Sequence, residues 1–153
     1  MSSHIERGAE FSESPPPGEL AARTLAMPAD TNPSGDIFGG WIMSLMDAAG
    51  AITATSRAGG RVVTAAVSNI AFLQPVKVGD VVCCYTDIRK IGRSSITLDV
   101  EVWVLRQGCG ERIKVTAAEF TYVALDESGR PRQVDRSENS AAIADEVPQP
   151  ADL

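Results

Sequence analysis

Histidine is almost absent from this 153-residue chain: its one histidine, His4, lies in a polar stretch that also holds Pro15-Pro16-Pro17. Ser-His-Asp and Cys-His nucleophile systems, histidine-ligated zinc centres and His-Asp dehydratase sites all need an imidazole in the core. The sequence therefore excludes these classes. It also contains no glycine-rich loop of the P-loop or dinucleotide-binding type. Any chemistry must depend on carboxylates, amides, hydroxyls and backbone donors, without a metal.

Cysteine is scarce as well, with three residues in the chain: Cys83, Cys84 and Cys109. Neighbouring residues of a strand point to opposite faces, so Cys83 and Cys84 cannot both reach one partner. An odd number of cysteines without the spacing of a disulfide framework is typical of reduced, intracellular thiols. We therefore expect a cytoplasmic protein.

Positive charge is in the minority: 14 Lys and Arg face 20 Asp and Glu, for a formal net charge of −6. This balance argues against nucleic acid or an anionic membrane as a partner. No apolar region of a signal peptide is found near the N-terminus. The apolar run 37–56 is long enough to span a bilayer, but it contains Asp47, three glycines and several hydroxyls. We interpret it as a buried helix.

The length fits a single domain. We expect flexible tails at 1–20 and 135–153, where the sequence is polar or rich in proline and acidic residues, and one folded domain at 21–134. The expected elements are a strand at 23–27, a loop at 30–36, a long helix that ends at Gly59, and strands at 61–73, 81–91, 95–105 and 111–125. A shift in the apolar phase of the last strand predicts a bulge near Ala117.

This order predicts an α+β domain in which an antiparallel sheet wraps one long central helix. The strand at 95–105 supports the interpretation, because its apolar residues alternate cleanly with polar ones, as in a half-buried antiparallel strand. A single sheet of this kind leaves open edges. We therefore expect at least a homodimer that extends the sheet.

Asp47 is the one residue with a formal charge between Asp36 and Arg57. A helical wheel places it in a stripe of small residues, opposite Phe38, Trp41, Ile42, Leu45, Ala49 and Ile52. An unpaired carboxylate among apolar neighbours costs several kcal/mol, so we expect the group to be used. The alternatives are that it caps a neighbouring loop or forms a structural ion pair with Arg57 or Arg61. Asp36 is expected to cap the helix.

Gly39 and Gly40 occupy the first turn of the predicted helix, where each lowers helix stability by roughly 1 kcal/mol relative to alanine. Two explanations stay open. Their backbone amides can hold a polarised oxygen at the positive end of the helix dipole, or the small residues can allow close packing against the sheet. Thr64 and Ser68, on the strand after the helix, are further candidates to line a site.

Five segments together resemble the YciA-like acyl-CoA thioesterases of the hotdog-fold superfamily, and the resemblance covers about residues 23–132. The segments are Asp30-Thr31-Asn32-Pro33-Ser34-Gly35-Asp36-Ile37-Phe38-Gly39-Gly40-Trp41, Leu45-Met46-Asp47, Arg61-Val62-Val63-Thr64, Phe72-Leu73-Gln74-Pro75-Val76-Lys77-Val78-Gly79-Asp80 and Gly92-Arg93-Ser94-Ser95.

This resemblance implies hydrolysis of acyl-CoA to a free acid and coenzyme A, with no cofactor beyond the CoA of the substrate. Asp47 matches the catalytic carboxylate of the family, as general base or nucleophile. Asn32 matches an asparagine that assists from the facing subunit, although alone it suits an Asn-Pro turn. The amides of Gly39 and Gly40 become candidates for polarising the thioester oxygen. A homohexamer, as a trimer of dimers, is the implied assembly.

The turn at 92–95 matches the family segment that lies near bound CoA. Arg93, with Ser94 and Ser95, suits CoA phosphates because a guanidinium forks onto phosphate oxygens; a solvated turn arginine is the alternative. Lys77 is a further candidate for CoA binding. A second function stays open: a non-catalytic acyl-CoA-binding sensor or regulator. That function would predict an added DNA-binding pair of helices, for which neither tail has the pattern or the charge.

Overall fold

The computed structural model describes residues 16–108, 110 and 112–135. Most of the two predicted tails, and Cys109, lie outside these residues. The elements follow the predicted order, with one helix and five strands: β1 (Glu19–Leu25), the 3-10 turn η1 (Pro28–Asp30), α1 (Gly39–Ala58), β2 (Val62–Phe72), β3 (Val81–Ile91), β4 (Ser95–Leu105) and β5 (Arg112–Ala124). The first strand begins four residues earlier than predicted, because its pairing with β3 starts at Glu19.

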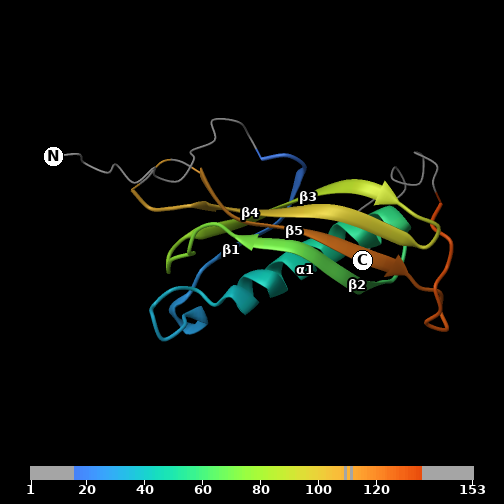
Figure 1. Cartoon of the computed structure of the whole chain (residues 1–153), viewed down its shortest axis with the longest axis horizontal. Coiled ribbons are helices and arrows are strands. Elements are labelled where there is room, and N and C mark those ends of the chain that lie inside the picture. The colour runs from blue at the N-terminus through green and yellow to red at the C-terminus, as the bar shows by residue number, and fades with distance from the viewer. Residues whose placement is uncertain (1–15, 109, 111, 136–153) are drawn as a thin grey trace, which may run out of the picture.

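The five strands form one antiparallel sheet in the order β1-β3-β4-β5-β2, and α1 lies across one face of it (Figure 1). This arrangement confirms the predicted α+β fold. β4 is the central strand, and its predicted apolar face is completely buried: Ile96, Leu98, Val100, Val102 and Val104 are each 0 % exposed. The helix and the sheet enclose this core between them.

A bulge lies in β5, as the phase shift predicted, two residues before the expected Ala117. Val102 of β4 pairs with Thr116, whereas the next residue, Trp103, pairs with Lys114. Val115 is left without a partner on β4. Val115 and Thr116 are consecutive residues and both are buried, so the alternation of buried and half-buried residues shifts by one position at the bulge. Beyond it every second residue is again buried, including Tyr122. The bulge therefore decides which side chains of β5 reach the helix.

The prediction that Asp36 caps α1 is wrong. The helix begins at Gly39, its N-cap residue is Phe38, and no side chain bonds the first turn. The two residues after Asp36 are held outside the helix, because the Ile37 N–H donates to the Val76 carbonyl (3.0 Å) and the Phe38 N–H donates to the Asp30 carbonyl (2.9 Å). Asp36 instead forms an ion pair with Lys77. The predicted end of the helix is confirmed, with Gly59 in the left-handed region (φ 69°).

The buried face of α1 differs from either side of the predicted wheel, because it takes residues from both: Ile42, Met46, Ala49, Gly50 and Ala54. Two bulky residues of the predicted apolar side are exposed, Phe38 (50 %) and Ile52 (57 %). In a single chain the helix is therefore covered on one face only, and the predicted wrapping is incomplete. Asp47 lies at the margin of the buried face, half-exposed.

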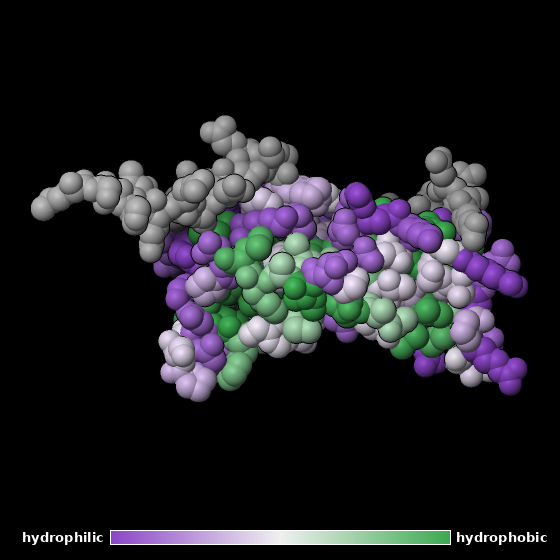
Figure 2. Space-filling model, viewed as in Figure 1, coloured by the Kyte–Doolittle hydropathy of each residue, from purple (hydrophilic) through white to green (hydrophobic). Residues whose placement is uncertain are grey.

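β2 is an edge strand, and most of its residues are exposed. Its exposed side chains include three large apolar ones: Val63, Val67 and Phe72. Figure 2 shows apolar side chains gathered along the face on which β2 lies in Figure 1. An edge strand with this composition is a template for pairing with another chain. In the described residues, no helix is long and apolar enough to cross a membrane.

Candidate active site

Asp47 is held at the margin of the helix by two hydroxyl groups of the sheet. Its Oδ1 accepts a hydrogen bond from the Thr64 hydroxyl (2.7 Å) and lies 3.0 Å from the hydroxyl of Tyr122. Thr64 on β2 and Tyr122 on β5 are directly paired across the two strands, so their side chains lie on the same face of the sheet. The strand register therefore creates the binding site for this carboxylate.

Sequence reasoning named Thr64 as a candidate but missed Tyr122. The Tyr122 side chain is completely buried, and its hydroxyl also lies 2.8 Å from the main-chain carbonyl of Asp47. Burial, and then the Asp47 carboxylate, raises the pKa of Tyr122 well above its ordinary value of 10.0, so the phenol stays protonated. A tyrosine at an inward position of the last strand was the available signal, because a buried tyrosine hydroxyl needs a partner.

The alternative of a structural ion pair for Asp47 finds no support, since no ion pair of the described residues involves it. Arg57 donates to the main-chain carbonyl of Asp135 (2.8 Å). The hydroxyls of Thr64 and Tyr122 both approach Oδ1, and no described residue bonds Oδ2. One oxygen is fixed by donors, and the other is available for an external group.

The start of α1 offers the two glycine amides that the sequence singled out. Trp41 and Ile42 donate to the Phe38 carbonyl (3.1 and 3.3 Å), whereas the amides of Gly39 and Gly40 have no acceptor among the described residues. A Cβ on Gly39 would lie 3.4 Å from the ring of Phe72, while one on Gly40 would have nothing within 4 Å. Close packing can therefore explain the glycine at position 39 but not the one at position 40, for which exposure of the backbone amide is the remaining explanation.

Asn32 organises the loop before the helix. Its side-chain oxygen accepts the backbone N–H groups of Ser34 (2.9 Å) and Asp36 (3.1 Å). Asn32 therefore forms the turn that the sequence suggested. The same two bonds fix its side-chain Oδ1, so the side-chain NH₂ group is oriented and remains free to donate. No bond connects Asn32 to Asp47 in the chain. Asp47 lies nine residues beyond Phe38, which is about 13 Å along a helix.

The structure does not bring the predicted CoA-binding residues together within one chain. Lys77 is bonded to Asp36, ahead of β3, while Arg93 follows β3 at its other end. The 11 residues of β3 separate them by about 36 Å. Arg93 is exposed, and its main-chain carbonyl accepts from Val134 N–H (2.8 Å). Ser94 and Ser95 complete this turn, each half-buried.

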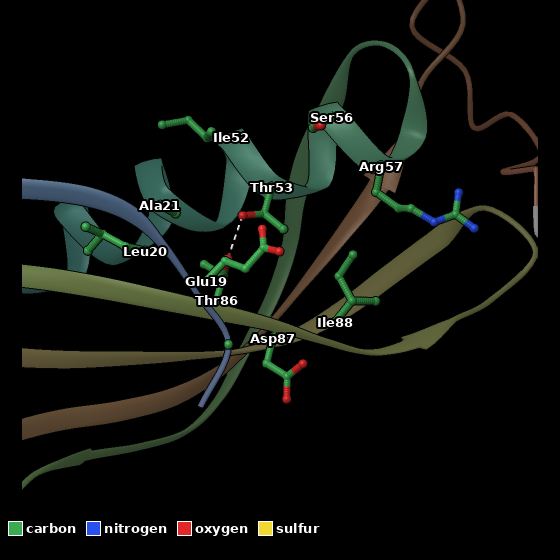
Figure 3. Close-up of a pocket in the computed structure, with 11 residues that line it drawn as sticks. Glu19, Leu20, Ala21, Ile52, Thr53, Ser56, Arg57, Thr86, Asp87 and Ile88 are labelled. Atoms are coloured by element: carbon green, nitrogen blue, oxygen red, sulfur yellow. Dashed lines mark hydrogen bonds between the residues drawn. The ribbon is translucent and has the colours of Figure 1, made fainter. Parts of the chain in front are cut away.

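A cleft lies between β1, the C-terminal half of α1 and β3 (Figure 3). Glu19, Arg57 and Asp87 are among the residues that line it, although the Asp87 side chain points away from the helix, and a hydrogen bond joins Thr53 to Thr86 (2.6 Å). None of its lining residues belongs to β2 or β5, the two strands that bond Asp47. This cleft is therefore separate from the Asp47 site.

Comparison with known proteins gives a consistent family. The model of the thioesterase superfamily matches residues 34–111. The acyl-CoA thioester hydrolase YciA of Salmonella typhimurium is 58 % identical over 120 residues, which is 76 % of this chain and 90 % of that protein. The hexameric thioesterase of Yersinia pestis superposes with a TM-score of 0.76, at 58 % identity, over 80 % of this chain and 99 % of that one.

The acyl-CoA hydrolase of Staphylococcus aureus is more distant. Its structure superposes with a TM-score of 0.71, at 29 % identity, over 86 % of this chain and 81 % of that one. That enzyme has been solved with an asparagine replaced by alanine, in complex with coenzyme A, and separately with an aspartate fifteen positions later replaced by alanine. One helix on a five-stranded antiparallel sheet, together with a TM-score of 0.75 at 42 % identity to a hotdog-fold thioesterase of Campylobacter jejuni, identifies a single hotdog domain. The chain belongs to the thioesterase superfamily, among its YciA-like acyl-CoA thioester hydrolases.

Proposed function

We propose that this chain hydrolyses acyl-CoA thioesters and that Asp47 is the catalytic carboxylate. The observation that carries the proposal is the asymmetry of this group: Oδ1 is occupied by the hydroxyls of Thr64 and Tyr122, while Oδ2 has no partner among the described residues. A carboxylate fixed in this manner presents one oxygen in a defined direction. Such preorganisation suits an attack on a thioester carbonyl.

Two routes fit this geometry, and both end in the same products. As a general base, Oδ2 takes a proton from water, the hydroxide adds to the carbonyl carbon, the C–S bond breaks, and CoA leaves as the thiol. As a nucleophile, Oδ2 attacks the carbonyl carbon itself, CoA leaves, and water then hydrolyses the mixed anhydride. Only the second route can transfer oxygen from labelled water into the side chain of Asp47, and it does so when water attacks the aspartyl carbon of the anhydride; attack at the acyl carbon places the labelled oxygen in the product acid. Mass spectrometry of the peptide after turnover in H₂¹⁸O detects the label in Asp47.

Asn32 of a second copy completes the site in this proposal. Within one chain, the helical rise separates the Asn32 loop from Asp47, so only another subunit can supply the asparagine there. Its oriented NH₂ group is then free to donate to the thioester oxygen, together with the Gly39 and Gly40 amides of the same second copy, which lie beside its Asn32 loop. Asn32 and Asp47 are fifteen positions apart, the same separation as the asparagine and aspartate replaced in the Staphylococcus aureus enzyme.

The partner copy is expected along β2. This edge strand exposes large apolar side chains, and so do α1 at Met43 and its N-cap residue at Phe38. Pairing of β2 with the β2 of a second copy would join the two sheets and cover these residues, which follows the usual two-fold symmetry of homodimers. The hexameric assembly of the Yersinia pestis relative supports three such dimers in one particle.

For the CoA moiety, Arg93 is the proposed phosphate ligand. Its side chain is exposed and forms no ion pair with any described residue, so the guanidinium is available to fork onto a phosphate. Ser94 and Ser95 offer further donors in the same turn. Lys77 is the weaker candidate, because its ammonium group is already bonded to Asp36.

A thiol-release assay tests the proposal, with acyl-CoAs of short, medium and long chains as substrates. Wild type is expected to release CoA, and Asp47→Asn to reduce kcat by about a thousandfold, since the carboxylate is the reacting group. Undiminished hydrolysis by Asp47→Asn would refute the catalytic assignment. Tight acyl-CoA binding without hydrolysis would instead favour the non-catalytic sensor.

A mixing experiment tests the shared site. Asp47→Asn and Asn32→Ala are co-expressed with different tags, and doubly tagged particles are purified. In a mixed dimer one site carries both changes and the other carries neither, so the mixed dimer has half of the wild-type activity. Random pairing makes about half of the dimers in the hexamers mixed, and about a quarter of wild-type activity is restored. If Asn32 and Asp47 act within one chain, every site contains one change, and the mixture stays as inactive as its two components.

A further inference from the structure

Gly50 lies one turn after Asp47 on α1, and the ring of Tyr122 occupies the space beside it. A Cβ on residue 50 would lie 2.3 Å from the Tyr122 hydroxyl oxygen and 3.0 Å from two carbons of the ring. A glycine inside a helix lowers helix stability by about 1 kcal/mol relative to alanine. Here the glycine is required, because any larger residue would push the phenol away from the helix.

The admitted hydroxyl reaches two oxygens of Asp47, the carboxylate Oδ1 (3.0 Å) and the main-chain carbonyl (2.8 Å). The ring itself has little freedom. It is 0 % exposed, and it stacks on Phe120 with the ring centroids 6.2 Å apart and the planes at 15°. Tyr122 therefore forms a rigid donor that the core holds against Asp47.

We infer that Tyr122 is a positioning residue for Asp47: its hydroxyl, admitted by Gly50, holds Oδ1 so that Oδ2 points to the reacting carbonyl. This inference rests on the proposed function, since it assigns Tyr122 a role in the same reaction. Tyr122 acts through Asp47 and does not itself touch the substrate.

The electrostatic surroundings support a donor role. Burial and the neighbouring carboxylate raise the pKa of Tyr122, so the phenol keeps its proton at the pH of any assay. β2 carries no charged side chain, and on β5 Lys114 pairs with Glu101 while Glu119 accepts from Ser68. Arg112, at the start of β5, is exposed. Among the described residues, Tyr122 is thus the titratable group in contact with Asp47.

The Tyr122 hydroxyl has a single proton, which it can donate either to Oδ1 or to the main-chain carbonyl of Asp47. Which of the two accepts it decides whether Tyr122 positions the carboxylate. If the proton goes to Oδ1, the bond stabilises the ionised carboxylate, and its loss makes protonation easier. If it goes to the main-chain carbonyl, Tyr122 supports the helix alone. The two cases predict different pH profiles.

The test compares Tyr122→Phe with wild type in the thiol-release assay between pH 4 and pH 9. Loss of a hydrogen bond to a charged group should reduce kcat about tenfold and move the acidic limb of the kcat/KM profile to higher pH by about one unit. KM should change little, because no substrate contact is lost. Tyr85→Phe, on the half-buried Tyr85 of β3, is the matched control and should leave both quantities unchanged.

Gly50→Ala provides a second variant. It should displace the phenol and reproduce the loss in kcat and the shift of the acidic limb. In the Tyr122→Phe background the 2.3 Å contact is gone, and the two ring carbons at 3.0 Å need to shift by only a few tenths of an ångström. Gly50→Ala should therefore add little further loss of kcat there. Full additivity of the two changes would contradict a shared mechanism.

The outcomes separate this inference from the proposed function. If Asp47→Asn is inactive while Tyr122→Phe keeps the wild-type kcat and acidic limb, the positioning role is wrong and the catalytic role of Asp47 stands. If Asp47→Asn retains full activity, the proposed function is wrong and Tyr122 has no carboxylate to position in this reaction.

Discussion

The ion pair between Asp80 and Arg106 should control both the stability of the fold and the activity of the proposed site. Arg106 binds the carboxylate with two nitrogens, at 3.1 Å to Oδ1 and 2.9 Å to Oδ2, and also donates to the Pro75 carbonyl (3.1 Å). Asp80 is 1 % exposed and accepts in addition the backbone N–H of Lys77 (2.8 Å). The pair therefore fixes the segment between β2 and β3.

This segment supports the loop that carries Asn32. The carbonyl of Val76 accepts the N–H of Ile37 (3.0 Å), and the side chain of Lys77 bonds Asp36. Asp36 in turn donates its backbone N–H to Asn32 Oδ1. A disturbance at Arg106 should consequently reach the asparagine through a continuous series of hydrogen bonds.

Arg106→Met removes the charge and keeps much of the apolar side chain, so the buried carboxylate of Asp80 loses its partner. Breaking a buried pair in this manner costs about 3–5 kcal/mol. The Arg106 side chain is 31 % exposed, and water can partly replace it, so we expect a loss of about 2–3 kcal/mol. For a domain of this size the melting temperature should fall by about 5–10 °C. We also expect about a tenfold loss in kcat/KM through the Asn32 loop.

Thermal unfolding at a fixed protein concentration measures the first effect, since assembly makes stability depend on concentration. Arg89→Met is the matched control: Arg89 pairs with Asp87 and Asp99, but its side chain is 59 % exposed, and exposed pairs contribute about 0–1 kcal/mol. Asp80→Asn in the Arg106→Met background should recover part of the loss, because a neutral amide oxygen can still accept from Lys77. A melting temperature for Arg106→Met no lower than that of Arg89→Met would refute the reasoning.

Three further predictions concern the assembly, the CoA site and acid stability. Val67 lies at the centre of β2, so symmetric pairing of two such strands should bring it near its own copy. Val67→Lys should place like charges there and abolish both the dimer and the activity, whereas Val67→Ile should preserve both. Light scattering measures the assembly, and thiol release measures the activity. Arg93→Ala should raise KM for acyl-CoA about tenfold with little change in kcat, unlike Arg130→Ala in the turn after β5; equal KM values for the two variants would contradict the assignment of Arg93 to CoA phosphates. Hydrogen bonds, first from the Ser128 side chain and then from the Arg130 backbone, lower the pKa of Asp126 below its ordinary value of 3.8. The ionised carboxylate therefore stabilises the fold above about pH 4, and this contribution disappears as the pH falls through the lowered pKa. Asp126→Asn should therefore be less stable than wild type at pH 6 and equal to it in strong acid, as urea unfolding at the two pH values will measure.

The helix, the strands and the central residue of the site could all be predicted from the amino-acid sequence. Local features were sufficient for this, because turn residues and the two- and 3.6-residue periods of strands and helices act over short ranges. The predicted limits of β3 and β4 match the structure, and a single carboxylate in an apolar helix directed attention to Asp47. The capping prediction for Asp36 was wrong because long-range bonds to Val76 and Asp30 hold the chain extended up to Phe38.

The surroundings of Asp47, by contrast, depend on contacts between residues that are distant in the sequence. The pairing of Thr64 with Tyr122 depends on the register of β2 against β5, which joins residues 58 positions apart and follows from no local pattern. The bulge at Val115 sets the phase in which Tyr122 points to the helix, and the absence of a side chain at Gly50 lets its hydroxyl approach. The orientation of the carboxylate is thus a product of three separate segments. Their contact depends on the packing of α1 on the sheet, which no single segment encodes.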